Sequence, residues 1–417
     1  MHKILNLLKR NKTILENFSY LGFLQIVNML IPLATYPYLI RVLEKDTYGL
    51  IILSQGIISY LVVIINFGFN ISATKDISIH RNNKMKLNEI VSSVLIIKFV
   101  LLIFASIILL ACIYLIPQLK EQQTLLILCM WMCFYEFIFP VWYYQGIEKM
   151  KYITLLTLAS RLIFLTFIFI LIKSKEDYLI LPMINGLGAL IAGGISLYII
   201  FVIHKIKFVV VPLKEIRIYL KEGFVLFLTN AVMVFKDKTN ILLIGSFIGT
   251  GAVSEFDLAI KIKDLLLMPI TLLNQAVYPK ISKERNMKFM MRILKVLFIS
   301  ITILSLIIFP FIDEIILFLA GEELIHAAYL IRLMIISVPI TTISFTLATN
   351  CINALGFYKL RLKSMMFTTL FYFALILTGY ILEFTDEILF YAYIIIAGYL
   401  VELFYRLYLV NKYKMLQ

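Results

Sequence analysis

Charged residues near the centres of long apolar stretches are the groups of this 417-residue sequence that could do chemistry. Arg161 lies near the middle of one such stretch, where an ionised side chain is costly unless it faces a water-filled or protein-lined interior. A guanidinium suits a bidentate contact with phosphate, so Arg161 is a candidate for binding an anionic group. An internal ion pair with Glu136, central in the preceding stretch, would explain Arg161 equally well.

The triplet Lys236-Asp237-Lys238 is the strongest polar interruption of any apolar stretch. Two residues separated by two positions point about 200° apart on a regular helix, so Lys236 and Lys238 can face one lumen only if the helix is unwound or kinked. A discontinuous helix that lines a binding site is one explanation. The other is a misplaced span in which one lysine extends to the membrane surface.

Other charges inside apolar stretches have simpler explanations. Lys98 either contacts a ligand or extends its stem to the cytoplasmic surface. Asp257 and Lys261 lie four residues apart with the acid first, which is the spacing of a local helical ion pair. Glu402 and Arg406 have the same spacing and are interpreted as a structural pair.

Amide and acidic side chains complete the set of candidates. Asn28, Asn66 and Asn70 would suit sugar hydroxyls in a lumen, and would equally suit interhelical hydrogen bonds. The carboxylates that could couple proton or cation movement to transport are those of Glu136, Asp237 and Asp257.

The composition identifies the environment of these residues. The chain is 62% hydrophobic and 15% charged, whereas soluble domains contain roughly 45–50% apolar residues. Its net charge of +14 is spread over short loops, so no nucleic-acid-binding face is expected. The sequence contains no nucleotide-binding loop, no zinc-ligand spacing and no nucleophile motif, so we expect no cofactor and no metal.

Apolar runs of spanning length predict an all-α membrane protein with about 12 transmembrane helices. The predicted spans are 18–40, 50–71, 90–113, 125–144, 153–172, 179–203, 223–245, 256–278, 294–312, 329–347, 366–382 and 388–410. The segment 18–40 is too long for the core of a signal peptide and is interpreted as the first retained span.

Lysine and arginine are distributed unevenly between alternate loops. One set of loops, which includes both termini, holds about 25 of them, and the other set holds about five. By the positive-inside rule, both termini are predicted to be cytoplasmic. The basic charge thus reports topology and contact with anionic lipids.

The chain divides into two halves of six spans. We predict an N-lobe over 1–203, a cytoplasmic linker over 204–222 and a C-lobe over 223–417. An even number of spans in each half means that both enter the membrane in the same direction. Two such halves are expected to be related by a pseudo-two-fold axis along the membrane normal.

Several motifs resemble those of one family. They are residues 17–21 (NFSYL), 25–28 (QIVN), Pro32, 35–43 (TYPYLIRVL), 48–49 (YG), 66–75 (NFGFNISATK), 257–261 (DLAIK) and 269–279 (PITLLNQAVYP). These segments resemble Wzx-type O-antigen and polysaccharide flippases, which belong to the multidrug, oligosaccharidyl-lipid and polysaccharide exporter superfamily.

The resemblance implies two six-helix lobes around a central, cationic cavity. It implies a multi-pass protein of the bacterial inner membrane that moves an undecaprenyl-pyrophosphate-linked oligosaccharide to the periplasmic leaflet by alternating access. Because the sequence has no nucleotide-binding loop, we expect the energy for transport to come from an ion gradient, the membrane potential or a downhill substrate gradient. Its implied partners are this substrate, membrane lipids, and the polymerase and chain-length proteins of the O-antigen pathway. The candidate substrate-binding residues are Arg161, Lys98, Lys236, Lys238, Lys261, Asn28, Asn66 and Asn70.

Two other functions are considered. A multidrug exporter of the same superfamily would favour acidic rather than basic groups in its lumen, because its usual substrates are cations. A membrane polymerase or ligase that uses lipid-linked sugars would be expected to carry a large periplasmic loop, and no external loop here exceeds about 20 residues.

Overall fold

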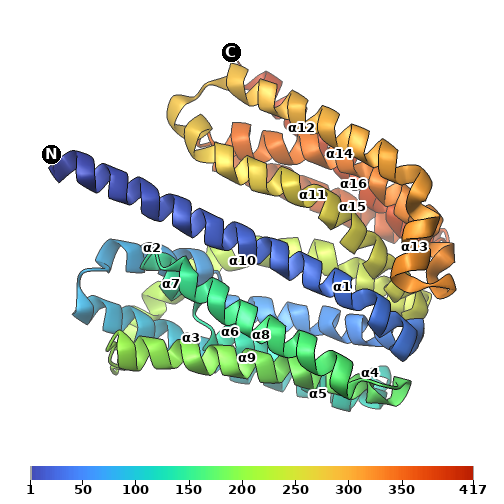
Figure 1. Cartoon of the computed structure of the whole chain (residues 1–417), viewed down its shortest axis with the longest axis horizontal. Coiled ribbons are helices and arrows are strands. Elements are labelled where there is room, and N and C mark those ends of the chain that lie inside the picture. The colour runs from blue at the N-terminus through green and yellow to red at the C-terminus, as the bar shows by residue number, and fades with distance from the viewer. Residues whose placement is uncertain (1, 417) are drawn as a thin grey trace. The chain divides into compact units, whose positions relative to one another are not determined.

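The computed structural model describes the backbone of residues 2–416 and the side chains of these residues except 2–15, 18 and 222. The N-terminal cations Lys3, Lys9, Arg10 and Lys12, used above for orientation, lie outside the described side chains. Within residues 2–416 every regular element is a helix, and no strand occurs (Figure 1). The all-α prediction is confirmed.

The helices cluster into two compact units. Unit 1 comprises residues 1–35 and 54–238, and unit 2 comprises residues 36–53 and 239–417. The first helix, α1 (His2–Asn66), contributes to both, because residues 36–53 group with unit 2. The lobe boundaries at 203 and 223 drawn from the sequence stay a prediction.

Unit 1 contains, besides part of α1, most of the helices of the first half of the chain. They are α2 (Phe69–His80), α3 (Lys84–Leu115), α4 (Pro117–Glu121), α5 (Gln123–Cys129), α6 (Trp131–Ile138), α7 (Val141–Gly146), α8 (Met150–Leu171), α9 (Ile180–Tyr198) and most of α10 (Leu213–Phe247). The segment between α9 and α10 packs along α3, since the Asn88 and Ser92 side chains accept the backbone N–H groups of Lys207 and Val209.

Unit 2 contains the end of α10 and the remaining long helices. They are α11 (Thr250–Glu284), α12 (Met287–Ile308), α13 (Ile312–Ala320), α14 (Ala328–Thr346), α15 (Tyr358–Ile381) and α16 (Ile388–Lys412). Short 3-10 and π turns join or extend several helices in both units, at Lys175–Leu179, Ile199–Ile203, Phe309–Phe311, Glu322–Ala327 and Leu347–Asn353.

Each of the twelve predicted spans is mostly helical in the structure. The predicted span 125–144 is divided among α5, α6 and α7, with residues 139–140 outside any helix, and the predicted span 50–71 crosses the turn at residues 67–68. In the described residues, nine helical segments are long and apolar enough to cross a membrane, or ten if the bent pair in α10 counts as one span. This bent pair of helices, the tenth candidate span, runs from Leu213 to Phe247 with a bend of 42° between Lys221 and Gly223. The run Ser19–His80 is counted once although it contains the two parts of α1, which meet at Glu44 where φ is 61°, and also α2 (Figure 1). The charged helix α11 does not pass the hydropathy test.

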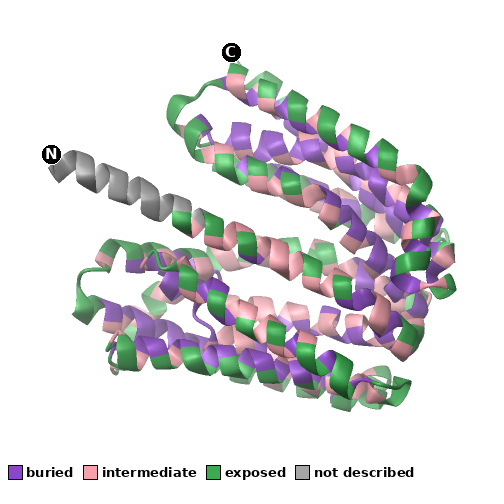
Figure 2. Cartoon of the chain, in the orientation of Figure 1, coloured by how far each residue is buried: buried purple, intermediate pink, exposed green. Residues whose placement is uncertain are grey.

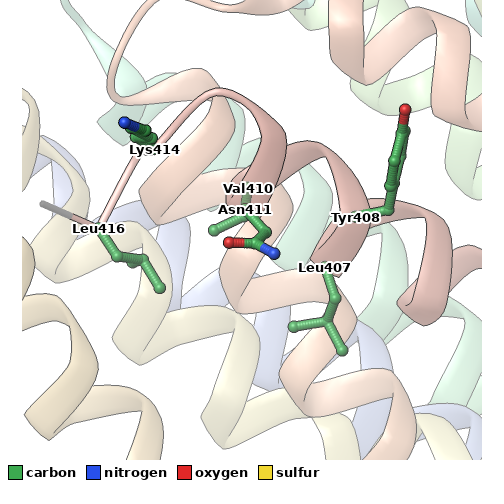
Figure 3. Close-up of a pocket in the computed structure, with 6 residues that line it drawn as sticks. All are labelled: Leu407, Tyr408, Val410, Asn411, Lys414 and Leu416. Carbon is green, nitrogen blue, oxygen red and sulfur yellow. The ribbon is translucent and has the colours of Figure 1, made fainter.

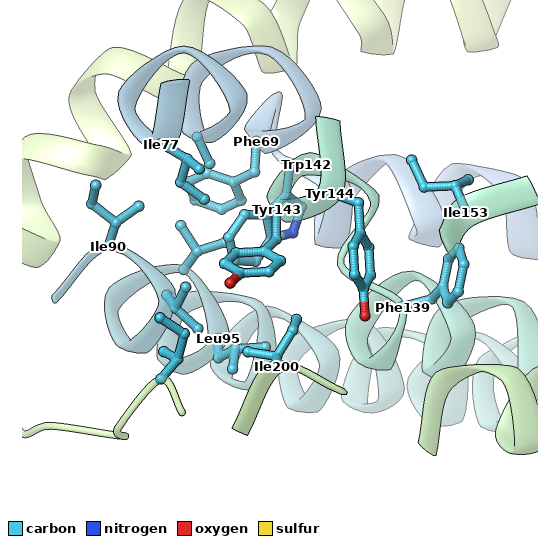
Figure 4. Close-up of a cluster of buried hydrophobic side chains, with 14 of the residues drawn as sticks. Phe69, Ile77, Ile90, Leu95, Phe139, Trp142, Tyr143, Tyr144, Ile153 and Ile200 are labelled. Carbon is cyan, nitrogen blue, oxygen red and sulfur yellow. The ribbon is translucent and has the colours of Figure 1, made fainter. Parts of the chain in front are cut away.

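Aromatic residues form the core of unit 1. Trp142, Tyr143 and Tyr144 of α7 are at most 2% exposed and pack against Phe69 of α2 and Ile90 of α3 (Figure 4). On the outer surface the distribution is inverted, because large apolar side chains along α3 and α12 are exposed (Figure 2). Exposed apolar faces on long helices are the pattern expected of a protein whose solvent is lipid.

Candidate functional site

Lys98, Glu136 and Asn66 form one polar cluster in unit 1, in which Lys98 is buried and the other two side chains are half-buried. Lys98 on α3 is 0% exposed, and its Nζ donates to Glu136 Oε1 at 2.7 Å and to the Glu136 carbonyl at 2.8 Å. Asn66, at the end of α1, donates from Nδ2 to the same Oε1 at 2.9 Å and accepts the Gly68 N–H at 3.1 Å. The predicted extension of Lys98 to the cytoplasmic surface is wrong, because an internal carboxylate satisfies the ammonium.

Arg161 has a different environment. It lies about three turns from either end of α8, and its Nε donates to Asn28 Oδ1 at 3.2 Å. No described carboxylate lies within 4 Å of its guanidinium. The predicted ion pair between Arg161 and Glu136 is therefore wrong, because Glu136 is paired with Lys98. The guanidinium keeps donors for which no protein acceptor is found among the described residues.

Lys261 occupies an aromatic cage in unit 2. Its Nζ pairs with Asp257 on the same helix, α11, and donates to Tyr48 Oη at 2.8 Å. The ammonium also lies 4.9 Å from the ring centroid of Tyr36 and 5.3 Å from that of Tyr48. The predicted local pair of Asp257 and Lys261 is confirmed. The two tyrosines were not predicted as partners of Lys261, although both lie in motifs that carry the family resemblance.

The triplet 236–238 lies in an unbroken part of α10. The helix bends at residue 222, more than three turns before Lys236, so the predicted break at the triplet is wrong. Lys236 and Lys238 are half-buried and Asp237 is exposed. On a continuous helix the two lysines point to different sides, so the triplet presents at most one of them to any single surface.

Glu402, Arg406 and Asn70 are the remaining residues singled out from the sequence. The Glu402–Arg406 pair on α16 is confirmed, and Arg406 also donates to Ser344. Asn70 on α2 is half-buried, and the structure places it in no polar cluster with the other candidates. The structure thus joins Lys98 with Glu136 and Asn66, Arg161 with Asn28, and Lys261 with Asp257.

A cavity of about 650 Å³ in unit 1 is lined by Phe67, Arg217, Leu220, Lys221 and Phe224, none of which was predicted as a site residue. Within the described residues no group of three or more His, Cys, Asp or Glu side chains could hold a metal ion. The four cysteines are free thiols, and all but Cys112 are buried.

Known proteins resemble this chain in sequence and in fold. The family described as "Polysaccharide biosynthesis protein" matches residues 14–285. A "Putative O-antigen transporter" of Escherichia coli K12 is 31% identical over 296 residues, which is 70% of each chain. A protein of the same name from Shigella dysenteriae is 30% identical over 283 residues, or 66% of this chain and 69% of that one.

The fold resembles a solved transporter structure. That structure is described as the inward-facing conformation of a multidrug resistance MATE family transporter of the MOP superfamily. It aligns with a TM-score of 0.73 and 14% sequence identity over 94% of both chains. At this identity the likeness concerns the fold alone.

Proposed function

Because the chain belongs to the polysaccharide biosynthesis protein family, we propose that it is a flippase for undecaprenyl-pyrophosphate-linked oligosaccharides. It moves the lipid-linked repeat unit from the cytoplasmic to the periplasmic leaflet of the bacterial inner membrane. The names of the two relatives support a transporter of O-antigen precursors, and the MATE-like fold supports a transporter architecture. The lipid tail, the pyrophosphate and the direction of movement are the proposed part.

The pyrophosphate assignment rests on the position of Arg161 in the membrane and on the absence of a carboxylate partner for its guanidinium among the described residues. Three turns of helix on either side place its guanidinium about 15 Å from both ends of α8, farther than the side chain can extend. It is held by an amide, Asn28, rather than by a carboxylate. A cation in this state can bind a pyrophosphate with little competition from protein acids, and it offers two parallel N–H groups to the phosphate oxygens.

The other cations have a different role in this proposal. Lys98 and Lys261 are each neutralised by a carboxylate, so neither is free to bind a pyrophosphate while its partner is ionised. Protonation of Glu136 or Asp257 would release the ammonium for the substrate. We therefore assign ion coupling to the Lys98–Glu136 and Lys261–Asp257 pairs. Arg161 is assigned direct contact with the pyrophosphate of the substrate while both pairs are ionised.

The test is complementation of a flippase-null strain, read as the O-antigen ladder on a gel. Arg161→Ala is expected to reduce the ladder at least tenfold at unchanged protein level, and Arg161→Lys to restore part of it, because a lysine keeps the charge but not the bidentate geometry. Val296→Ala, at an exposed lipid-facing position, is the matched control and should leave the ladder intact. A full ladder with Arg161→Ala would refute the assignment of Arg161.

The same strains separate the rival transporter. A multidrug exporter would bind organic cations, and the structure leaves neither Glu136 nor Asp257 unpaired for that purpose. Expression of the wild-type chain is expected to restore the O-antigen ladder without raising resistance to cationic dyes. Dye resistance without a ladder would favour the exporter instead.

A further inference from the structure

Two neighbouring cavities of unit 2 lie at the start of α12 and the end of α16. One, of about 310 Å³, is lined by Met287, Lys288, Met291, Arg292, Lys295 and Leu416. The other, of about 560 Å³, is lined by Leu407, Tyr408, Val410, Asn411, Lys414 and Leu416 (Figure 3). Because they share Leu416, we treat them together as the α12–α16 cleft.

The α12–α16 cleft is strongly cationic. Four of its described lining residues are Lys or Arg and none is acidic. Three of the cations lie on the N-terminal part of α12, and Lys288 lies in its first turn, where the helix dipole also favours an anion. Tyr408 and Asn411 add polar groups that can donate to phosphate oxygens. The cleft therefore matches an anion that carries several oxygen acceptors.

Along one face of α12, the side chains change from charged near the cleft to apolar towards the C-terminal end of the helix. Residues three and four apart share a face of a helix, so the cations continue directly into apolar side chains. This face contains Lys288, Arg292, Lys295, Ile299, Ile303 and Leu306. Ile299, Ile303 and Leu306 are 56%, 53% and 68% exposed.

The end of α16 has the same arrangement. Phe404 and Leu407 are 65% and 41% exposed, and Asn411 lies one turn beyond Leu407 on the same face (Figure 3). Lys414 follows just after the helix ends. Each helix thus offers polar groups at its end and an exposed apolar surface towards its centre. A soluble anion would use only the first part of this surface.

We propose that the α12–α16 cleft binds the headgroup of an anionic phospholipid such as phosphatidylglycerol. The phosphate lies against Arg292, Lys295 and Lys414, and the acyl chains follow the apolar faces of α12 and α16. Basic pockets between transmembrane helices are suited to such headgroups, because the cations compensate the phosphate and the lipid stays in its leaflet. This site is separate from the proposed transport function.

Native mass spectrometry of the delipidated full-length protein titrated with phosphatidylglycerol tests the proposal. Combined replacement Lys288→Gln, Arg292→Gln and Lys295→Gln is expected to weaken phosphatidylglycerol binding at least about tenfold, since each cation near the surface contributes substantially. These side chains are exposed, so the variant should fold. The matched control replaces three exposed cations of unit 1, Lys75→Gln, Lys84→Gln and Lys86→Gln, and should change binding by less than about twofold.

Two results would overturn the proposal. Equal losses in the cleft variant and in the control would mean that binding depends on total charge rather than on this cleft. Displacement of phosphatidylglycerol by millimolar sn-glycerol 3-phosphate would mean that the cleft binds a soluble phosphate and does not require acyl chains. Weaker binding in the cleft variant alone, with no displacement by glycerol phosphate, would support the lipid assignment.

Discussion

At the scale of single residues, three cations within the helices have different partners; Lys98 is buried, and Lys261 and Arg161 are half-buried. Lys98 is enclosed by a carboxylate and a carbonyl, Lys261 by a carboxylate and two aromatic rings, and Arg161 by one amide. Removing one member of a buried ion pair leaves the other charge uncompensated, whereas removing both does not. Replacing the cation by a neutral residue therefore leaves an uncompensated carboxylate at Lys98 and at Lys261, but not at Arg161.

Lys98→Met is expected to destabilise the protein by about 2–4 kcal/mol, because the Glu136 carboxylate, whose side chain is 19% exposed, would lose its ammonium partner. Replacing both partners, Lys98→Met with Glu136→Leu, should recover most of that loss. Thermal unfolding of the purified variants in detergent measures both. If the double variant were as unstable as Lys98→Met alone, the destabilisation would not come from the uncompensated Glu136 carboxylate.

His204 is expected to make the protein sensitive to acid. Burial, and secondly the nearby Lys149 ammonium, lower the pKa of this imidazole below its usual value of 6.5. Its Nδ1 lies 3.1 Å from Tyr143 Oη, and its Nε2 lies 3.5 Å from Lys149 Nζ. Since an ammonium only donates, Nε2 must accept, which requires the neutral ring with its proton on Nδ1.

A group whose pKa is lower in the folded state contributes stability that is present above its unfolded pKa and lost as the pH falls. We expect the unfolding temperature of the wild type to decrease between pH 7 and pH 5 by more than that of His204→Gln, which cannot titrate. Scans of both proteins in the same detergent compare the slopes. Parallel slopes would exclude His204 as the source of acid sensitivity.

At the scale of elements, close backbone approach constrains the helices of unit 2. A Cβ added at Gly49 on α1 would lie 1.8 Å from the carbonyl oxygen of Thr250, at the start of α11. At Gly194 on α9, by contrast, a Cβ would meet nothing within 4 Å. The two glycines therefore provide a matched pair within helices.

Gly49→Ala is expected to destabilise the protein by roughly 1–3 kcal/mol, because the backbone of α11 must move to make room. Gly194→Ala should be neutral or stabilising by up to about 1 kcal/mol, because alanine loses less backbone entropy in a helix. Unfolding midpoints measured for both variants decide the matter. A neutral Gly49→Ala would show that α1 and α11 are not in tight contact.

At the scale of the whole molecule, the distribution of cations predicts how the chain is oriented. Ser174, between α8 and α9, is in a loop predicted to be periplasmic, and Asn286, before α12, is in one predicted to be cytoplasmic. Both are exposed, so a cysteine at either position could react.

We expect Ser174→Cys to react with a membrane-impermeant maleimide in spheroplasts, and Asn286→Cys to react only after permeabilisation. Variants lacking the four native cysteines provide the background. The opposite labelling pattern would invert the proposed orientation. Equal labelling of both positions would indicate that one loop is misplaced.

Much of the element scale could be predicted from the sequence, because a lipid solvent requires long apolar runs whose backbone groups are satisfied within helices. Each of the twelve predicted spans is mostly helical, although 125–144 is split among three helices, and the charged helix α11 was predicted although it does not pass the hydropathy test. Pairs four residues apart, Asp257–Lys261 and Glu402–Arg406, were also predictable, because helix geometry brings such residues together.

The pairing of charges between helices was decided only by the tertiary structure. Glu136 could have neutralised Arg161 or Lys98, and nothing in the spacing of these residues distinguishes the two. Helix packing placed Lys98 beside Glu136 and left Arg161 with Asn28. In the same way, Tyr36 and Tyr48 reach Lys261 only because residues 36–53 pack with α11. Sequence determines which groups are buried in hydrocarbon, but contacts between distant segments depend on packing that local periodicity does not encode.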